Sequence, residues 1–310
     1  MTGRARDGIE APAATEAESG VETPFQRFRA DFFESRVAMA AFAVLVGIVF
    51  IAVAAPWISP QNPYDLAQVS VLDSKLPPGE QSMTGQTFYL GTDGAGRDLL
   101  SAMFYGLRIS LGVGVMSGII AMCIGATIGL IAAYFGGRTD TLIMRLVDIQ
   151  LSFPAILVAL ILLAVLGKGV DKIIIALVVV QWAYYARTVR GSALVERNKE
   201  YIEAAQCLVL SHNRIVFRHL LPNCMPPLIV VGTLQTAHAI ALEATLSFLG
   251  VGLPISEPSL GLLIANGFDY MLSHKYWISF FPGAALLITI VSINLVGDQL
   301  RDVLNPRLQR

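Results

Sequence analysis

The chain has 310 residues, of which 55% are hydrophobic and only 15% are charged. This amount of polar surface cannot cover a soluble globule, so the composition predicts an integral membrane protein. The formal net charge is -1, and the basic residues are scattered between apolar runs, which argues against nucleic-acid binding.

The N-terminal segment, residues 1–24, is polar and rich in Ala, Glu and Thr. It lacks the short apolar core and small-residue cleavage site of a secretory signal, so we expect the first span to stay uncleaved. Its many charged residues leave little apolar surface to bury. The segment is therefore predicted to be a disordered tail.

Six apolar segments are long enough to cross a membrane. A hydrocarbon core about 30 Å thick requires about 20 apolar residues in a helix that rises about 1.5 Å per residue. Each segment is expected to be helical because unpaired backbone groups are costly in lipid. The chain is thus predicted to be an all-α, polytopic membrane protein with about six transmembrane helices, at 37–55, 109–134, 149–166, 173–189, 225–249 and 278–296.

The Lys and Arg residues are distributed unevenly between the loops. Of the 22, 16 fall before the first span, after the last span, in the loop that follows the second span, or at the end of the fourth span and in the loop after it. By the positive-inside rule, both termini and the basic loop at 190–223 are predicted to be cytoplasmic. The long loop at 56–108 then lies on the extracytoplasmic side.

Small residues and a proline mark the second and third predicted spans. Gly114 and Gly118, and again Gly125 and Gly129, have the spacing that lets a neighbouring helix approach closely in lipid, so we expect them to be packing sites. Pro154 is predicted to bend the third span and to free a backbone carbonyl group. It is therefore a candidate residue of a translocation path.

Glu243 lies within the fifth predicted span, where an ionisable side chain costs about 2.5 to 3.5 kcal/mol on insertion scales. It must face protein or water. One interpretation makes it a path or gate residue, and the other makes it a hydrogen-bonded or protonated structural carboxyl group. Arg145 and Asp148, three residues apart on one helix face, are expected to form a structural ion pair. The cysteines and histidines show no metal-ligand spacing, so no metal site is predicted.

The basic loop after the fourth span also has apolar residues in a helical rhythm. Tyr201, Ala204, Ala205 and Leu208 fall at positions i, i+3, i+4 and i+7, which is one stripe of a helix. The two alanines keep the stripe flat, so another protein could approach it closely. Periodicity alone leaves a second interpretation open, in which the helix packs beneath its own bundle.

A second short helix is predicted after this one. Ser211 is expected to cap it by accepting a backbone N–H bond. Pro222 cannot donate a helical hydrogen bond and disfavours helix in Leu221, so we expect the second helix to end there, before the fifth span. The loop is therefore interpreted as helix, turn, helix.

Glu203, Ala204 and Ala205, followed at a distance by Leu221 and Pro222, resemble the cytoplasmic EAA loop of the membrane subunits of ABC importers. In that family this loop couples the membrane subunit to an ATPase. The resemblance implies that the coupling residues here are Tyr201, Glu203, Ala204, Ala205, Leu208, Val209, Ser211, Leu221 and Pro222.

Val209 departs from the family pattern, which has glycine at this position. Glycine ends a helix easily at positive φ, whereas a valine in that conformation is strained. We therefore expect the turn to shift toward Ser211 or to open differently.

Three further segments resemble the dipeptide and oligopeptide permease family, specifically its C-type subunit. They are residues 91–98 with the Ser and Arg residues that follow, residues 247–252, and residues 297–302. The resemblance covers most of the chain after Phe25. It implies the type I ABC importer transmembrane fold, with a first helix and a long loop at 25–108, a core at 109–300 with its coupling loop at 196–222, and a cytoplasmic tail at 301–310.

The same resemblance implies the pore-forming subunit of a binding-protein-dependent importer that moves di- or oligopeptides across a bacterial inner membrane. The implied partners are a B-type permease subunit, two ATPase subunits, an extracytoplasmic solute-binding protein and the lipid bilayer. The chain has no G-x-x-x-x-G-K-[ST] phosphate loop, so it is predicted not to be an enzyme. It should bind no cofactor itself, and the partner ATPases use ATP and Mg.

Other functions fit the sequence less well, and the exact substrate is not fixed by it. The same branch also carries metal chelates and other solutes, so the substrate stays open. An ion-driven secondary transporter would need polar midplane sites on broken helices, where this chain has little beyond Glu243 and Pro154, and it would have no use for a docking loop. An intramembrane hydrolase is disfavoured because the G-x-S-x-G elbow is absent.

Overall fold

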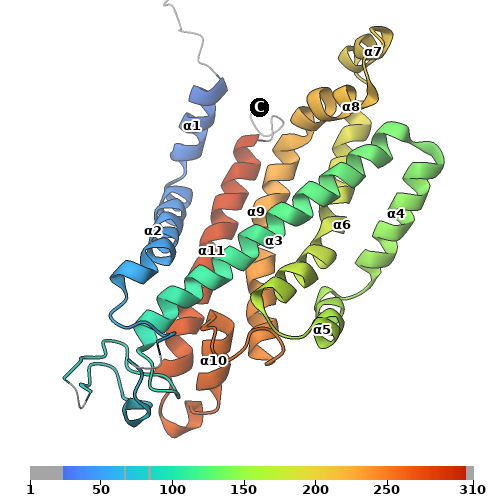
Figure 1. The fold of residues 1–310 in the computed structure, drawn as a ribbon. Coiled ribbons are helices and arrows are strands. Elements are labelled where there is room, and N and C mark those ends of the chain that lie inside the picture. The colour runs from blue at the N-terminus through green and yellow to red at the C-terminus, as the bar shows by residue number, and fades with distance from the viewer. Residues whose placement is uncertain (1–23, 66–67, 83–84, 305–310) are drawn as a thin grey trace, which may run out of the picture.

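The computed structural model describes residues 24–65, 68–82 and 85–304, and within this part of the chain all the regular elements are helical. Of the predicted N-terminal tail at 1–24, residues 1–23 lie outside the described residues, as do residues 305–310, and Pro24 is the first residue of a helix. Figure 1 shows the order of the elements. They are α1 (Pro24–Glu34), α2 (Arg36–Ile58), η1 (Val71–Asp73), α3 (Leu99–Phe135), α4 (Gly137–Ser152), α5 (Ala155–Leu166), α6 (Val170–Glu196), α7 (Glu200–Cys207), α8 (His212–Arg214), the π-helical η2 (Ile215–Leu220), α9 (Leu221–Phe248), α10 (Leu260–Phe268), η3 (Met271–Ser273) and α11 (Trp277–Leu304).

Five of the predicted spans are confirmed as helices that are long and apolar enough to cross a membrane. They are α2, α3, α6, the continuous helical stretch His212–Phe248 and α11. The third predicted span is wrong as a single helix, because α4 and α5 meet at an angle of 89°. The predicted bend at Pro154 is confirmed. Proline disfavours helix in the residue before it, and Phe153 is extended (φ -89°, ψ 139°).

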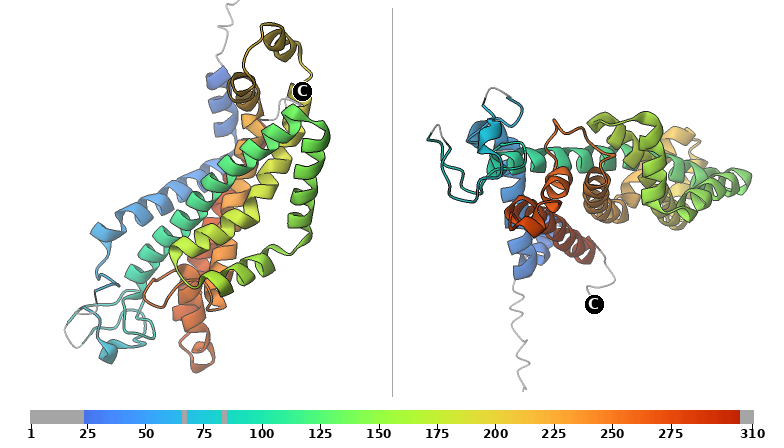
Figure 2. Two further views of the ribbon diagram at one scale, coloured as in Figure 1. Left: turned by 45° about the vertical axis from the view of Figure 1, so that its right-hand side comes forward. Right: turned by 90° about the horizontal axis from the view of Figure 1, so that it is seen from below.

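Helix α3 is 37 residues long and crosses the bundle obliquely, with α2 beside its beginning and α4 turning back from its end (Figures 1 and 2). Its predicted small-residue packing sites are confirmed. A methyl group added at Gly125 or Gly129 would lie 2.3 Å from the Trp182 carbonyl oxygen or 2.4 Å from that of Ala186, both on α6. A methyl group added at Gly114 would lie 2.5 Å from the Ile240 side chain and 3.3 Å from the Thr236 carbonyl oxygen, both on α9. Backbone contact of this kind is what small residues permit between helices in lipid.

Two ion pairs join the end of α6 to α4. Arg190 donates to both carboxylate oxygens of Asp140, at 2.5 and 2.6 Å, and Arg187 pairs with Asp148. The predicted pairing of Arg145 with Asp148 is therefore wrong. Asp148 faces the neighbouring helix, where a guanidinium group 39 positions later in the chain reaches it.

The segment at 91–98 anchors the start of α3. Asp93 accepts bonds from the backbone N–H groups of Ala95 and Arg97, and its other oxygen is 2.8 Å from the Arg97 Nε atom. Asp98 caps α3 by accepting the Ser101 N–H at 2.9 Å. Asp93, Arg97 and Asp98 are all at least 95% buried. The distinctive motif thus forms a tightly bonded turn, with Asp93 and Arg97 as its clasp, that ends in the N-cap of α3.

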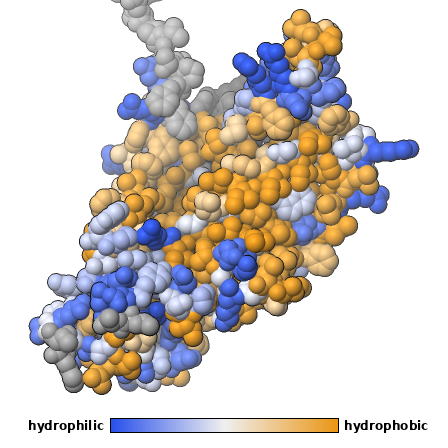
Figure 3. All heavy atoms as spheres, viewed as in Figure 1, coloured by the Kyte–Doolittle hydropathy of each residue, from blue (hydrophilic) through white to orange (hydrophobic). Residues whose placement is uncertain are grey.

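The two ends of the bundle are formed by different segments of the chain. The loop between α2 and α3 lies at one end together with α10, and the α7–α8 hairpin lies at the other (Figure 1). Helix α1 and the C-terminal end of α11 lie on the same side of the bundle as α7 (Figure 1). There the Gln299 side chain donates to the Asp31 carbonyl oxygen at 3.0 Å. Apolar side chains cover the middle of the molecule between these ends (Figure 3).

Candidate functional site

Helix α7 is anchored to the end of α6 by the Glu196 carboxylate. One oxygen of Glu196 accepts from the Lys199 Nζ atom at 2.7 Å, and the other accepts from the Tyr201 hydroxyl group at 2.8 Å. Burial, together with the hydrogen bond to Glu196, raises the pKa of Tyr201 above its ordinary value. The hydroxyl group of Tyr201 and the ammonium group of Lys199 thus hold the start of α7 to the end of α6 through one carboxylate.

The predicted apolar stripe of α7 is divided between two faces. Ala205 is 5% exposed and lies on the inner face beside the fully buried Ile202, in a cluster with residues from α3, α6, η2 and α9. Tyr201, Ala204 and Leu208 are exposed. Both interpretations of the loop therefore hold in part, because one face packs on the chain's own bundle and the other is free. Ile202 was missed at the sequence level, although its spacing of three from Ala205 is an inner-face signal.

The turn after α7 has not moved. Val209 adopts the left-handed conformation expected of glycine, with φ +53°, so the predicted shift toward Ser211 is wrong. The Val209 N–H bonds to the Gln206 carbonyl oxygen at 2.9 Å, and the Leu210 N–H bonds to that of Ala205 at 3.2 Å. This pair of bonds is the Schellman helix ending. The conformation costs about 1–2 kcal/mol in any residue that carries a Cβ atom.

The second helix of the hairpin differs from its prediction. Ser211 occupies the N-cap position, but its side chain accepts no capping bond. Pro222 does not end the helix, because the chain continues from α8 through η2 into α9, with Pro222 in the first turn of α9 and Leu221 as its first residue. A proline ring clashes with the carbonyl group four residues earlier, and the wider π-helical turn before Pro222 relieves this conflict.

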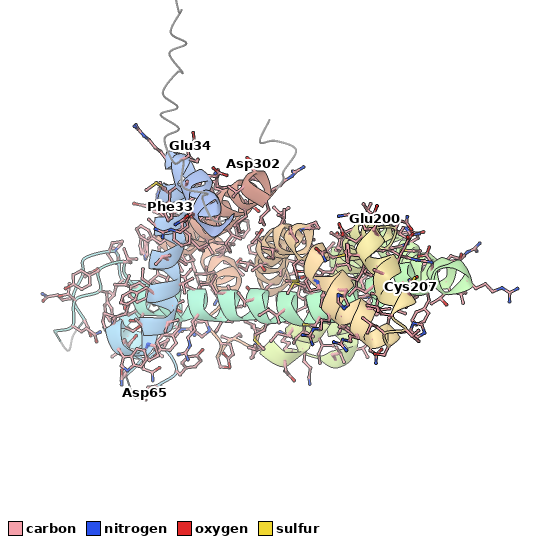
Figure 4. All side chains as sticks on the ribbon, turned by 90° about the horizontal axis from the view of Figure 1, so that it is seen from above. Phe33, Glu34, Asp65, Glu200, Cys207 and Asp302 are labelled. Atoms are coloured by element: carbon pink, nitrogen blue, oxygen red, sulfur yellow. The ribbon has the colours of Figure 1, made fainter. Side chains whose placement is uncertain are left out.

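The free face of α7 is acidic as well as apolar. Glu200 and Glu203 are both exposed, and Glu200 and Cys207 mark the two ends of the helix in Figure 4. Helix α7 lies well apart from α1, whose Phe33 and Glu34 are labelled in the same view. The hairpin is thus reachable by a partner that approaches this end of the bundle.

Glu243 is fully buried between α3 and α9. The Ser110 hydroxyl group donates to one carboxylate oxygen and the Ser247 hydroxyl group donates to the other, both at 2.8 Å. This geometry fits a structural carboxyl group, and a path or gate role stays a prediction. Pro154 is exposed at the break between α4 and α5, so the structure does not bring it together with Glu243.

Comparison with known proteins identifies relatives over most of the chain. Residues 125–310 match the family described as the inner membrane component of binding-protein-dependent transport systems, and residues 23–78 match the N-terminal membrane domain of oligopeptide transport permease C. A Brucella suis protein named for a peptide transport system permease is 44% identical, with 86% of each chain covered.

Two further relatives and a solved structure extend the comparison. The di/tripeptide transport system permease DppC of Pseudomonas aeruginosa is 37% identical, with 93% of each chain covered. The oligopeptide permease OppC of Bacillus subtilis is 37% identical, with 90% of this chain and 88% of that protein covered. The inward-facing MetNI methionine ABC transporter matches 67% of this chain and 98% of its own, with a TM-score of 0.55 and 21% identity.

Proposed function

Because the chain belongs to the family of inner-membrane components of binding-protein-dependent transport systems, we propose that it is the permease subunit of a bacterial importer of di- or oligopeptides. The observation that supports this proposal most directly is the α7 hairpin, in which Ala205 packs on the bundle while Glu203 and Ala204 of the same motif stay exposed at the basic end. The positive-inside rule makes this end cytoplasmic.

In the proposed transporter, pore formation, substrate delivery and ATP hydrolysis belong to different subunits. This chain pairs with a B-type permease subunit to form the pore, and a solute-binding protein delivers the peptide from outside. Two ATPase subunits bind at the cytoplasmic side and hydrolyse ATP with Mg, because this chain has no phosphate-binding loop of its own. The catalytic chemistry therefore belongs to the partners.

The contacts of α7 support a rigid transmission of force. Its inner face lies in one apolar cluster with parts of α3, α6 and α9, and the Glu196 carboxylate fixes its outer edge through Tyr201 and Lys199. A displacement of α7 by a partner would therefore carry these three helices with it. Such a movement would switch the pore between inward-open and outward-open states.

Two substitutions on the free face test the docking function. Glu203→Lys reverses a charge and Ala204→Trp adds bulk, and we expect each to reduce co-purification of the ATPase subunits and substrate-stimulated ATP hydrolysis. Glu80→Lys reverses a charge that is also exposed, at the opposite end of the molecule, and serves as the matched control. Wild-type behaviour of both α7 variants in both assays would refute docking at this site.

The substrate class needs its own measurement. The reconstituted transporter, with its binding protein, should take up labelled di- and oligopeptides with saturable, ATP-dependent kinetics. Uptake of a metal chelate without peptide uptake would contradict the peptide assignment while leaving the permease function intact.

A further inference from the structure

The turn at Val209 needs a left-handed residue but does not need a valine side chain. Three non-glycine residues in the described part of the chain have positive φ, namely Lys75, Val209 and His274, and Val209 alone is β-branched. The Schellman bonds at this turn are backbone bonds, so glycine would form them equally well and without strain. A strained residue that persists at an accessible site points to a role for its side chain.

The Val209 side chain contributes almost nothing to packing within the chain. It is 88% exposed, and the preceding Leu208 is 73% exposed. Ala204 and Cys207, the neighbouring small residues on α7, are exposed as well. We call these four residues the apolar tip. Figure 3 shows apolar atoms gathered over α7, at the top of the molecule and beyond the main apolar belt.

An apolar tip outside the membrane-spanning belt indicates a binding partner. The charges beside the tip decide which kind of partner fits. Glu200 and Glu203 are exposed on α7, and Lys199, Arg214 and Arg218 are exposed on the flanking parts of the hairpin, so charges of both signs surround the tip. A soluble protein that offers an apolar pocket with a rim of mixed charge is complementary to this arrangement, whereas a uniformly anionic lipid surface is not.

We propose that Leu208 and Val209 insert into an apolar pocket of the cognate ATPase subunit, and that Val209 is a specificity-determining residue for the choice of ATPase. The inference rests on the proposed coupling function of α7. In this proposal the Val209 side chain contacts the ATPase, although a valine in the left-handed conformation makes the turn less stable than a glycine would.

Two variants of Val209 separate strain from contact. Val209→Gly removes both the strain and the side chain, so the thermal midpoint of the purified chain should rise while the affinity of the permease pair for the ATPase falls. Val209→Thr keeps the shape and the strain but places a hydroxyl group in the pocket. Its midpoint should match the wild type, and its affinity should also fall. The expected loss is about tenfold for each, the size typical of a truncated contact at an interface centre.

The matched control is Leu272→Ala, because Leu272 is a 98% exposed leucine near the opposite end of the molecule. It should change neither measurement. Val209→Gly binding the ATPase as tightly as the wild type, or more tightly, would overturn the inference. If Glu203→Lys then still abolished binding, the proposed function would stand and only the role of Val209 would fall. If no α7 variant weakened binding, docking at α7 would fall as well.

Discussion

Ser110 of α3 and Glu243 of α9, 133 positions apart in the chain, are joined by a 2.8 Å hydrogen bond inside the bundle. Ser247, one turn after Glu243, donates to the second carboxylate oxygen. Both serines are at least 99% buried, so their hydroxyl groups depend on this carboxyl group for a partner. These hydrogen bonds join α3 to α9 inside the bundle, where burying a polar group without a partner is costly.

Substitutions of Glu243 distinguish the structural role from a gating role. Glu243→Ala leaves two buried hydroxyl groups unpaired beside a cavity, and we expect a loss of about 2–4 kcal/mol in the free energy of unfolding. Glu243→Gln keeps the size and an acceptor oxygen, so it should retain both folding and most of the peptide uptake. A glutamine variant that folds normally but transports nothing would instead establish the gate.

The contact between α3 and α6 predicts a sharp difference between two glycines of the same helix. Gly129→Ala places a methyl group 2.4 Å from the Ala186 carbonyl oxygen, and separating the backbones should cost about 1–3 kcal/mol. Gly112→Ala is the control, because nothing lies within 4 Å of its added methyl group. The thermal midpoint should fall for the first variant and stay level or rise for the second. Equal midpoints would contradict the close packing.

The spans could be predicted from the sequence because run length and hydropathy are local properties. The break at Pro154 is local too, since a proline acts on its nearest neighbours. The partner of Asp148 could not be predicted, because Arg187 reaches it only after α4 and α6 have packed. The same limit applies to Ala205, whose inward direction is set by the cluster beneath α7. Val209 shows a different limit, in which backbone bonds around the turn override the residue's own preference.

Asp98 predicts a dependence of stability on pH. Burial raises its pKa above the ordinary value of about 4, although the bonds from Ser101 oppose the shift. The folded state therefore holds the proton more tightly than the unfolded chain does. The stabilising contribution is full below pH 4 and is lost as the pH rises through the folded pKa.

Asp98→Asn should remove this dependence. Asparagine is an equally good N-cap, so α3 should keep its start. The wild-type thermal midpoint should fall more between pH 4 and pH 7 than that of the variant, with Glu80→Gln as the exposed control. Parallel pH profiles for the wild type and Asp98→Asn would refute the shift.

The clasp formed by Asp93 and Arg97 provides a test of how the turn before α3 is held together. The Arg97 side chain also donates to the Ile255 carbonyl oxygen at 3.3 Å, so this one guanidinium group joins two loops. Arg97→Met leaves the Asp93 carboxylate buried without its cation, and we expect a loss of about 3–5 kcal/mol in the free energy of unfolding.

The double variant Arg97→Met with Asp93→Asn should recover part of this loss, because it removes the uncompensated charge while the amide oxygen keeps accepting the backbone N–H groups of Ala95 and Arg97. Chemical unfolding of the two single variants and the double variant measures the coupling. The exposed pair of Lys172 and Asp171 is the comparison, and Asp171→Asn should cause no measurable change. A double variant that is as unstable as the sum of the two single variants would show that the buried charge is not the cause, and that the loop depends on the bridge to Ile255.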